Sequence, residues 1–343
     1  MKHVRRLLVL SVGIAALGCN RSSPKPENII SEKVVENNVQ VNIYRLDTAV
    51  FAAAKQLDTL AAYHRSMLAE PRSFYRTYLA NILQVLPDSN TVFSLYRFAG
   101  NRQFRSLQTE IAKAYPANFS QREKLQQAVA KLNRWFPNKP VPEIYLYNSG
   151  FNVGIWPDTS VIGIGLEWYL GEKHPVVKSL PPDFPQWQRA NMNPDYMVQD
   201  AIKGWLLVNT YRKEVVKNVM AYLCFYGKVL YVTEAAVGEV ADSTLHSYSA
   251  AQMSWAYAQE KNAWKELVGK NLLFSTKERD ITRLTSDGPF TPGLPQDSPP
   301  MMGAFIGYKM VADYMNKFPN TSVQDLFYKV ADEEIVKAYK GKR

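Results

Sequence analysis

The chain has 343 residues, of which 46% are hydrophobic, and its formal net charge at pH 7 is +10. A chain of this length can bury one large core or two modest ones. The basic residues form no stripe with regular aromatic interleaving and accompany no nucleic-acid-binding motif. We therefore do not expect nucleic acid as a partner.

The N-terminus has the parts of a bacterial lipoprotein signal peptide. Basic residues stand at positions 2, 5 and 6, and the apolar run over residues 7–17 is too short to span a bilayer as a helix. Residues 16–19 read Ala-Leu-Gly-Cys and match a lipobox. We expect residues 1–18 to be removed and Cys19 to be acylated.

The polar, proline-containing residues after the cysteine predict a tether over residues 19–38. An acylated Cys19 cannot form a disulfide with Cys224, the other cysteine of the chain. No intramolecular disulfide is therefore expected. Cys224 stands in an apolar run, residues 219–225, which is typical of a small core residue.

Residues 39–343 are predicted to form a single globular domain, because no linker longer than a loop interrupts its amphipathic elements. Its N-terminal part, residues 39–140, is predominantly helical by pattern. Ser120 followed by Glu123 is a capping-box signature. The elements expected in this part are a strand over 41–47, a helix over 48–63, and a helical stretch over 74–136 that contains a helix over 121–135.

The second part, residues 141–343, opens with strands and continues with helices. The apolar residues of the stretch 195–208 recur mostly at three- and four-residue spacing, which predicts a buried helix, with Asn193 as its cap and Pro194 in its first turn. The fold class predicted is α+β, predominantly α-helical. The other expected elements are strands over 143–148, 151–156 and 160–166, the last two forming a hairpin, helices over 213–234, 249–269 and 301–318, and loops over 175–185 and 286–300.

A β-hairpin that leads into a long buried helix is the layout of zincin metallopeptidases, in which that helix carries H-E-x-x-H. The aligned positions here hold Gln199, Asp200 and Lys203, with Ala201 and Ile202 between them. The third zinc ligand of a zincin, commonly a Glu followed by Gly, aligns with Tyr226 and its following glycine. The sequence therefore predicts a zincin-like core with a small sheet and hairpin whose zinc-ligand motif is lost.

The substitutions remove the metal chemistry. A neutral amide is a poor zinc ligand, and a protonated lysine is not a ligand. A lysine ammonium about 4 Å from a divalent cation is repelled by roughly 8 kcal/mol at an effective dielectric near 20. We therefore predict no metal, no cofactor and no catalytic residue. Two interpretations stay open: Gln199, Asp200, Lys203 and Tyr226 belong to ordinary helix faces, or they form a remodelled pocket that binds something.

Several short motifs occur in the order found in the gliding motility-associated lipoprotein B family (GldB) of the Bacteroidota, and the chain resembles that family. They are residues 147–151 (YNSGF), 164–171 (IGLEWYLG), 220–231, 249–264, 273–276 (LFST), 288–290 (GPF), 298–300 (SPP) and 303–307 (GAFIG).

The resemblance implies an outer-membrane lipoprotein needed for gliding motility and for type IX protein secretion, with other envelope proteins as partners. It implies no catalytic activity and a fold related to zincins. In Bacteroidota an acidic run after the lipidated cysteine resembles a surface-export signal. Its absence after Cys19 favours a protein that faces the periplasm.

Three function classes follow. The first is a non-enzymatic envelope lipoprotein that acts by protein–protein contact. The second is a hydrolase that works through a remodelled pocket around Asp200, Lys203 and Tyr226. The third is a lipoprotein that binds glycans or peptides, suggested by an aromatic content of 12%. A groove lined by exposed aromatic side chains would favour the third class.

Overall fold

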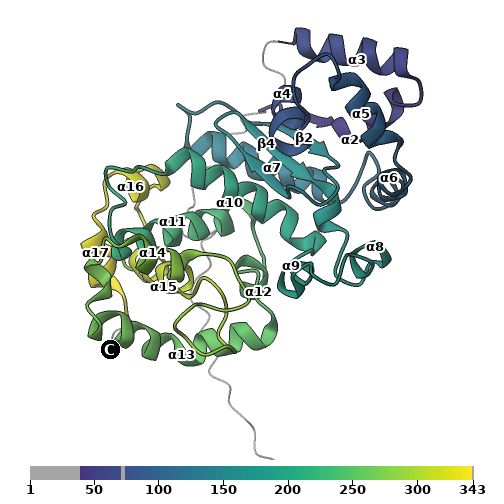
Figure 1. Ribbon diagram of the computed structural model, residues 1–343. Helices are drawn as coiled ribbons and strands as arrows, with labels where there is room; N and C mark the ends of the chain where they lie inside the picture. The colour runs from purple at the N-terminus through teal and green to yellow at the C-terminus, as the bar shows by residue number, and fades with distance from the viewer. Residues whose placement is uncertain (1–38, 71–73, 342–343) are drawn as a thin grey trace, which may run out of the picture.

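The computed structural model describes residues 39–70 and 74–341. They form a small sheet with helices on both sides (Figure 1), so the predicted α+β, predominantly helical fold class is confirmed. The predicted signal peptide (residues 1–18) and tether (residues 19–38), with Cys19, lie outside the described residues. None of the described helices is both long and apolar enough to pass through a membrane.

The N-terminal part is helical, as predicted, apart from one short strand. The predicted helix over 121–135 is confirmed at both ends, whereas the single helix predicted over 48–63 is wrong. The chain turns at Lys55 and Gln56, and this turn escapes a sequence pattern because it contains neither Gly nor Pro. The elements are β1 (Ile43–Arg45), α2 (Leu46–Ala53), α3 (Leu57–Ala69), α4 (Tyr75–Thr77), η1 (Tyr78–Ile82), α5 (Thr91–Gly100), α6 (Arg102–Ala114) and α7 (Gln121–Trp135).

The second part continues with three strands and a series of helices. Its elements are β2 (Glu143–Tyr147), β3 (Ile155–Pro157), β4 (Val161–Gly165), η2 (Leu166–Tyr169), α8 (Pro175–Lys178), α9 (Gln186–Ala190), η3 (Pro194–Tyr196), α10 (Met197–Thr210), α11 (Val219–Val237), α12 (Asp242–Leu245), α13 (Ala250–Gly269), η4 (Leu272–Phe274), α14 (Glu278–Thr285), α15 (Met302–Lys317), α16 (Val323–Tyr328) and α17 (Asp332–Ala338).

Two expectations in this part need correction. The helix predicted over 213–234 begins at Val219, because Asn218 caps it by accepting a hydrogen bond from the backbone N–H of Ala221 at 2.9 Å. The loop predicted over 175–185 contains α8, and Val177 is fully buried rather than at the surface. The loop over 286–300 is confirmed as free of regular structure.

The four strands form one mixed sheet in the order β1-β2-β4-β3. β1, β2 and β4 are parallel, and β3 pairs antiparallel with β4 at one edge, which confirms the predicted hairpin. Because β1 pairs with β2, the N-terminal part of the domain supplies a strand to the sheet of the second part. The two parts therefore share one sheet.

The strand predicted over 151–156 starts only at Ile155, because the chain before it forms a tight loop. Gly150 and Phe151 both have φ in the left-handed region, at 67° and 66°. A Cβ on Gly150 would lie 2.5 Å from the ring of Phe104. This loop lies at the carboxyl end of β2 and, as described below, surrounds a buried carboxylate.

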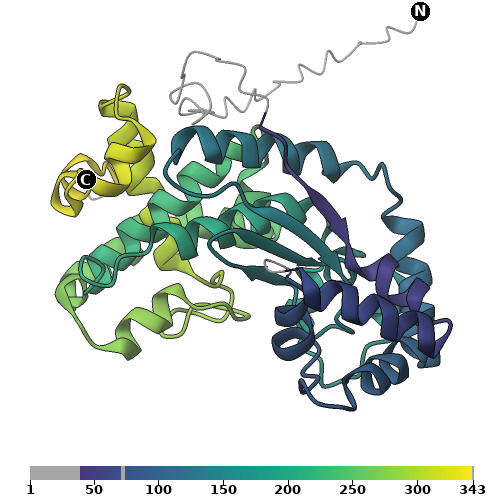
Figure 2. The ribbon, with the colours of Figure 1, turned by 90° about the horizontal axis from the view of Figure 1, so that it is seen from above.

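Side chains alternate between the two faces of the sheet. Ile144, Ile162 and Ile164 pack in the main hydrophobic core with residues of α7, α10, α11 and α15. Tyr145 and Tyr147 point to the other face and pack in a second core with residues of α2, α4, η1 and α5. Figure 2 shows the first helices of the chain (purple to dark blue) and the C-terminal helices (green to yellow) on opposite sides of the sheet, whereas α7 packs on the side of the main core.

The helices α11 and α15 cross in close contact at two glycines. A Cβ on Gly227 would lie 2.1 Å from the carbonyl oxygen of Gly307, and a Cβ on Gly307 would lie 1.9 Å from the carbonyl oxygen of Leu223. The neighbouring atoms belong to the backbone and cannot move aside cheaply. The close packing of α11 against α15 therefore explains why residue 227 is a glycine. In the same helix Cys224 is a free, buried core residue, as predicted.

Replacing Gly227 by alanine should destabilise the protein by about 1–3 kcal/mol or more, because the added methyl group forces the two helices apart. Urea or thermal unfolding of the purified variant measures the loss. Gly100→Ala is the matched control, because a Cβ there has no heavy atom within 4 Å. Equal stability of the two variants would contradict the close crossing.

Candidate functional site

The central helix α10 carries three of the residues singled out in the sequence. The predicted cap forms on the 3-10 turn η3, which runs directly into α10: the Asn193 side chain accepts a hydrogen bond from the backbone N–H of Asp195 at 3.0 Å, and Pro194 is the first residue of η3. Asp200 and Lys203 lie one turn apart on α10. Both line a cleft of about 200 Å³. Figure 1 shows the helices α9, α10 and α12, whose residues or flanking residues contribute to its lining.

The lining of this cleft comes from segments that are far apart in the sequence. The lining contains both aromatic and polar side chains. The lining residues are Gly154, Trp168, Tyr169, Trp187, Gln188, Asn191, Tyr196, Asp200, Lys203, Ser247 and Asp287. The cleft opens to solvent, since the side chains of Lys203 and Asp200 remain 27% and 22% exposed.

The two charged residues of α10 pair with each other in this cleft. Lys203 Nζ lies 2.9 Å from Asp200 Oδ1, and the hydroxyl of Tyr169 donates to Asp200 Oδ2 at 3.3 Å. Burial lowers the pKa of Lys203, but the carboxylates of Asp200 and Asp287 outweigh burial, so the pKa is raised. The cleft therefore holds a permanent ammonium group bound to a carboxylate.

Gln199 is fully buried and does not line the cleft. Its side-chain amide donates to the carbonyl of Thr244 and to Ser247 Oγ, the latter at 3.3 Å. These bonds fasten α10 to α12 and to Ser247, which follows it. Gln199 thus holds Ser247 from behind the cleft, whereas Lys203 lies in the cleft lining.

Tyr226 on α11 is half-buried among core residues and lines no part of the cleft. Burial, followed by the Asp287 carboxylate, raises the pKa of its hydroxyl, whereas Lys203 lowers it. Tyr226 therefore lies near the charges of the cleft and stays neutral. Of the four positions that the sequence pattern aligned with a zincin active site, the structure brings only Asp200 and Lys203 together in the cleft.

His246 is the histidine nearest to this region. Its ring stacks on Tyr248 at 5.4 Å and packs edge-on against Phe305 and Tyr308. Burial, and then Lys203, lowers its pKa to about 3, so the ring is neutral at physiological pH. Within residues 39–70 and 74–341 no group of three or more His, Cys, Asp or Glu residues has a geometry that could hold a metal ion.

A buried carboxylate that the sequence analysis did not single out stands directly behind the cleft wall. Glu167 is fully buried, and one of its oxygens, Oε1, accepts hydrogen bonds from the Ser149 N–H at 2.7 Å, the Ser149 hydroxyl at 2.5 Å and the Phe151 N–H at 3.1 Å. Burial raises its pKa, and these hydrogen bonds oppose the rise. Glu167 precedes Trp168 and Tyr169, so it fixes the backbone that places both rings.

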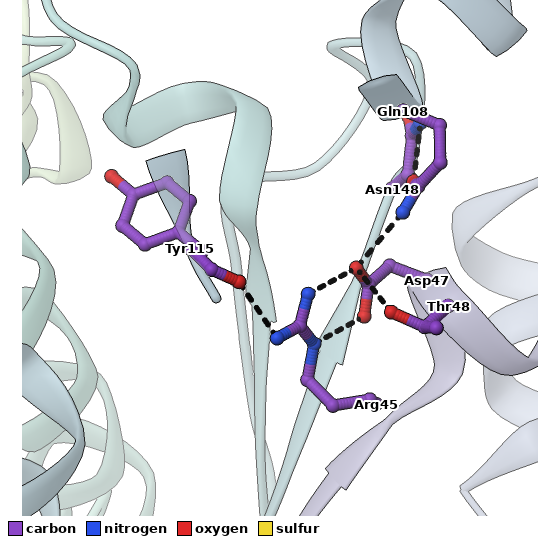
Figure 3. Close-up of polar contacts among 6 residues, drawn as sticks. All are labelled: Arg45, Asp47, Thr48, Gln108, Tyr115 and Asn148. Carbon is purple, nitrogen blue, oxygen red and sulfur yellow. Dashed lines mark hydrogen bonds and ion pairs between the residues drawn. The ribbon is translucent and has the colours of Figure 1, made fainter. Parts of the chain in front are cut away.

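A second buried carboxylate stands at the carboxyl end of β1 (Figure 3). Asp47 has no exposed side-chain surface and receives two hydrogen bonds of 2.7 Å from the guanidinium of Arg45. Gln108 Nε2 donates to Asp47 at 3.0 Å, and Asn148 donates to Gln108 Oε1 at 3.2 Å. Arg45 also reaches the carbonyl of Tyr115 at 2.8 Å.

These hydrogen bonds form one connected group that holds the segment of the cleft wall from behind. Asn148 and Ser149 are adjacent in the chain, so the Asp47 group and the Glu167 group join at the carboxyl end of β2. The hydroxyl of Tyr115 donates to the carbonyl of Tyr169. The sequence feature that could have pointed to these residues is a polar residue shortly after the end of each parallel strand. We call this set the strand-end network: Arg45, Asp47, Gln108, Tyr115, Asn148, Ser149 and Glu167.

Replacing Asp47 by alanine should cost about 3 kcal/mol of stability, because it leaves the charge of Arg45 and the amide of Gln108 without their shared partner. Chemical unfolding of the purified protein measures the loss. Asp58→Ala, in the exposed first turn of α3, is the control and should cost less than about 1 kcal/mol. Equal losses in the two variants would contradict the role assigned to Asp47.

The comparisons with known proteins give one match. The model of a protein family described as "Gliding motility protein GldB" matches residues 27–341, which is most of the chain. No curated protein and no solved structure matches. The matched region includes the cleft and the strand-end network.

Proposed function

The chain belongs to the GldB family of gliding motility proteins, and from this membership we propose that it supports gliding motility and type IX protein secretion through contacts with other envelope proteins, without catalysis. The family is described as one of gliding motility lipoproteins. The single observation that carries the proposal is the match over residues 27–341.

The chemistry of the cleft supports a non-catalytic role. A hydrolase without a metal needs a base that is free to accept a proton from water and a means of activating that water. Asp200 is the only candidate base on α10, and both of its oxygens already receive hydrogen bonds, from Lys203 and Tyr169. Gln199 and Tyr226 lie outside the cleft lining. The arrangement favours an ion pair that shapes a surface.

We also propose that the core descends from a zincin-like ancestor. The arrangement that supports this idea is an antiparallel edge strand, β3, next to the buried helix α10, with α11 packed behind that helix. Asp200 and Lys203 occupy positions of the zinc-binding motif on α10. The ancestral metal site, on this proposal, was replaced by an ion pair.

The proposed location is the outer membrane, with the folded domain in the periplasm. The support comes from the sequence: the lipobox at residues 16–19, and the absence of an acidic run after Cys19. The lipoprotein family agrees with association with the cell envelope.

If the cleft performs no chemistry, Asp200→Ala and Lys203→Met should each restore gliding and secretion in a deletion strain to nearly the wild-type level. Each variant removes one charge of an ion pair that is partly exposed, so its effect on stability should be small. Spreading of colonies and the amount of secreted protein are the measurements.

Trp205→Ala is the contrasting variant. This ring is 1% exposed, and its removal should destabilise the core by about 3–5 kcal/mol and lower the cellular level of the protein. Complete loss of gliding in the Asp200→Ala strain, at a normal protein level and with an unchanged fold, would overturn the non-catalytic proposal and favour a hydrolase with a remodelled pocket.

Cys19→Ala should release the protein from the membrane fraction, because the acyl chains are the proposed anchor. Cell fractionation followed by immunoblotting measures the shift, and mass spectrometry of the wild-type protein should find a lipidated N-terminal cysteine. Cys224→Ala is the control and should leave the protein in the membrane fraction. An unmodified Cys19 in the wild-type protein would contradict the anchor.

A further inference from the structure

We propose that the cleft above α10 is a binding site for a neutral saccharide and holds one sugar ring at a time. This inference concerns a ligand of the cleft and goes beyond the proposed role in gliding and secretion. It rests on the aromatic rings, the polar groups, the charges and the size of the cleft.

The aromatic rings of the cleft supply the apolar surface that a sugar ring needs. Trp168, Trp187, Tyr169 and Tyr196 all line it. Trp168 and Trp187 are half-buried, so each retains an exposed part. The C–H faces of a sugar pack on flat aromatic rings, and the hydroxyl groups at the ring edge remain available for hydrogen bonds.

The position of Trp168 is fixed before any ligand arrives. Its ring lies 6.3 Å from the ring of Phe151 and 5.9 Å from the ring of Phe184, measured between centroids. On another side it rests on Gly154, where an added Cβ would approach the indole to 3.2 Å. Glu167, one residue earlier, holds the backbone through the strand-end network. A preorganised ring loses little conformational entropy when a ligand binds.

The polar groups of the cleft suit hydroxyl groups, which donate and accept hydrogen bonds at once. Gln188 on α9 and Asn191 directly after it carry both donors and acceptors, as does the hydroxyl of Ser247. Asp287 adds an exposed acceptor. The indole Nε1 of Trp168 is buried and has no hydrogen-bond partner within the part of the chain that the structure describes.

The charges of the cleft favour a neutral ligand over an ionic one. An anion would meet the carboxylates of Asp200 and Asp287, and a cation would meet the ammonium group of Lys203. Because Asp200 and Lys203 already pair at 2.9 Å, an anion would have to break that pair to gain the ammonium group, and a cation that leaves the pair intact would gain only the exposed carboxylate of Asp287. A neutral polyol can instead hydrogen-bond to both groups and leave the pair intact.

The size of the cleft limits the ligand to a single ring. Its volume of about 200 Å³ is below the roughly 300–1,000 Å³ of pockets that enclose drug-sized molecules. Since the cleft opens to solvent, the remaining rings of a longer glycan would lie outside it. The expected ligand is therefore one unit of a neutral oligosaccharide, held with modest affinity.

Binding can be measured with the full-length lipidated protein in detergent, by isothermal titration and by saturation-transfer NMR. The probes are the linear trisaccharides of N-acetylglucosamine, glucose and mannose, with trilysine and glucose 6-phosphate as the charged comparison ligands. At least one neutral trisaccharide should bind with one-to-one stoichiometry and a Kd between micromolar and millimolar. Both charged ligands should bind at least tenfold more weakly than that trisaccharide.

The variant that tests the site is Trp187→Ala, which removes one aromatic surface from the short helix α9. It should weaken binding at least tenfold, and Trp187→Phe should restore part of it. Phe93→Ala, in α5, is the matched control: it removes a ring that is 54% exposed and does not line the cleft. It should leave the Kd unchanged. Circular dichroism and thermal unfolding should show that each variant remains folded.

Three results would overturn the proposal. They are no binding of any neutral trisaccharide, tighter binding of trilysine or glucose 6-phosphate, and an unchanged Kd in a folded Trp187→Ala variant. Tight binding of trilysine would identify a basic peptide as the preferred ligand instead. None of these measurements uses gliding or secretion, so failure of this inference and failure of the proposed function are distinguishable.

Discussion

The arrangement of this protein depends on carboxylates that are buried at the carboxyl ends of the parallel strands. Asp47 and Glu167 are fully buried, and a buried charge without partners costs several kcal/mol. Arg45, Gln108 and the loop around Ser149 supply the hydrogen bonds that offset this cost. The two groups are joined by the Asn148 amide, which donates to Gln108 Oε1, and by the Tyr115 hydroxyl, which donates to the Tyr169 carbonyl. These bonds link the N-terminal helices to the segment that carries the cleft wall.

The same arrangement explains why the short motifs of the family occur together. Residues 147–151 and 164–171 are separate in the sequence, yet Ser149 and Glu167 meet in one hydrogen-bonded unit. Gly150 is required there because its φ is positive and Phe104 leaves no room for a side chain. A glycine is also required at position 227, because the backbones of α11 and α15 touch there. These family motifs thus maintain the shape of the molecule, and Trp168 and Tyr169 carry that shape into the cleft.

Local patterns predicted much of the fold, and long-range contacts account for what they missed. The helix over 121–135, the capped entry to α10 at Asn193 and the β3–β4 hairpin all depend on neighbours in the sequence. The strand-end network joins positions up to about 120 residues apart, and no spacing rule connects Asp47 with Gln108 or Ser149 with Glu167. Gln199 and Lys203 were correctly placed on one helix. Their different environments arise because Gln199 is buried against Thr244 and Ser247, whereas Lys203 lines the open cleft, and these long-range contacts do not appear in the helical periodicity.

The edges of the sheet affect how readily the protein would aggregate at high local concentration in the cell envelope. A free strand edge is a template for pairing with other chains, and an anchored protein would meet copies of itself at high local concentration. Among the described strands β1 and β3 form the two edges, but each spans only three residues, and Pro157 in β3 lacks the N–H group that a new strand would need. The short edge strands and this proline therefore act as a safeguard against aggregation, independent of any partner the protein serves.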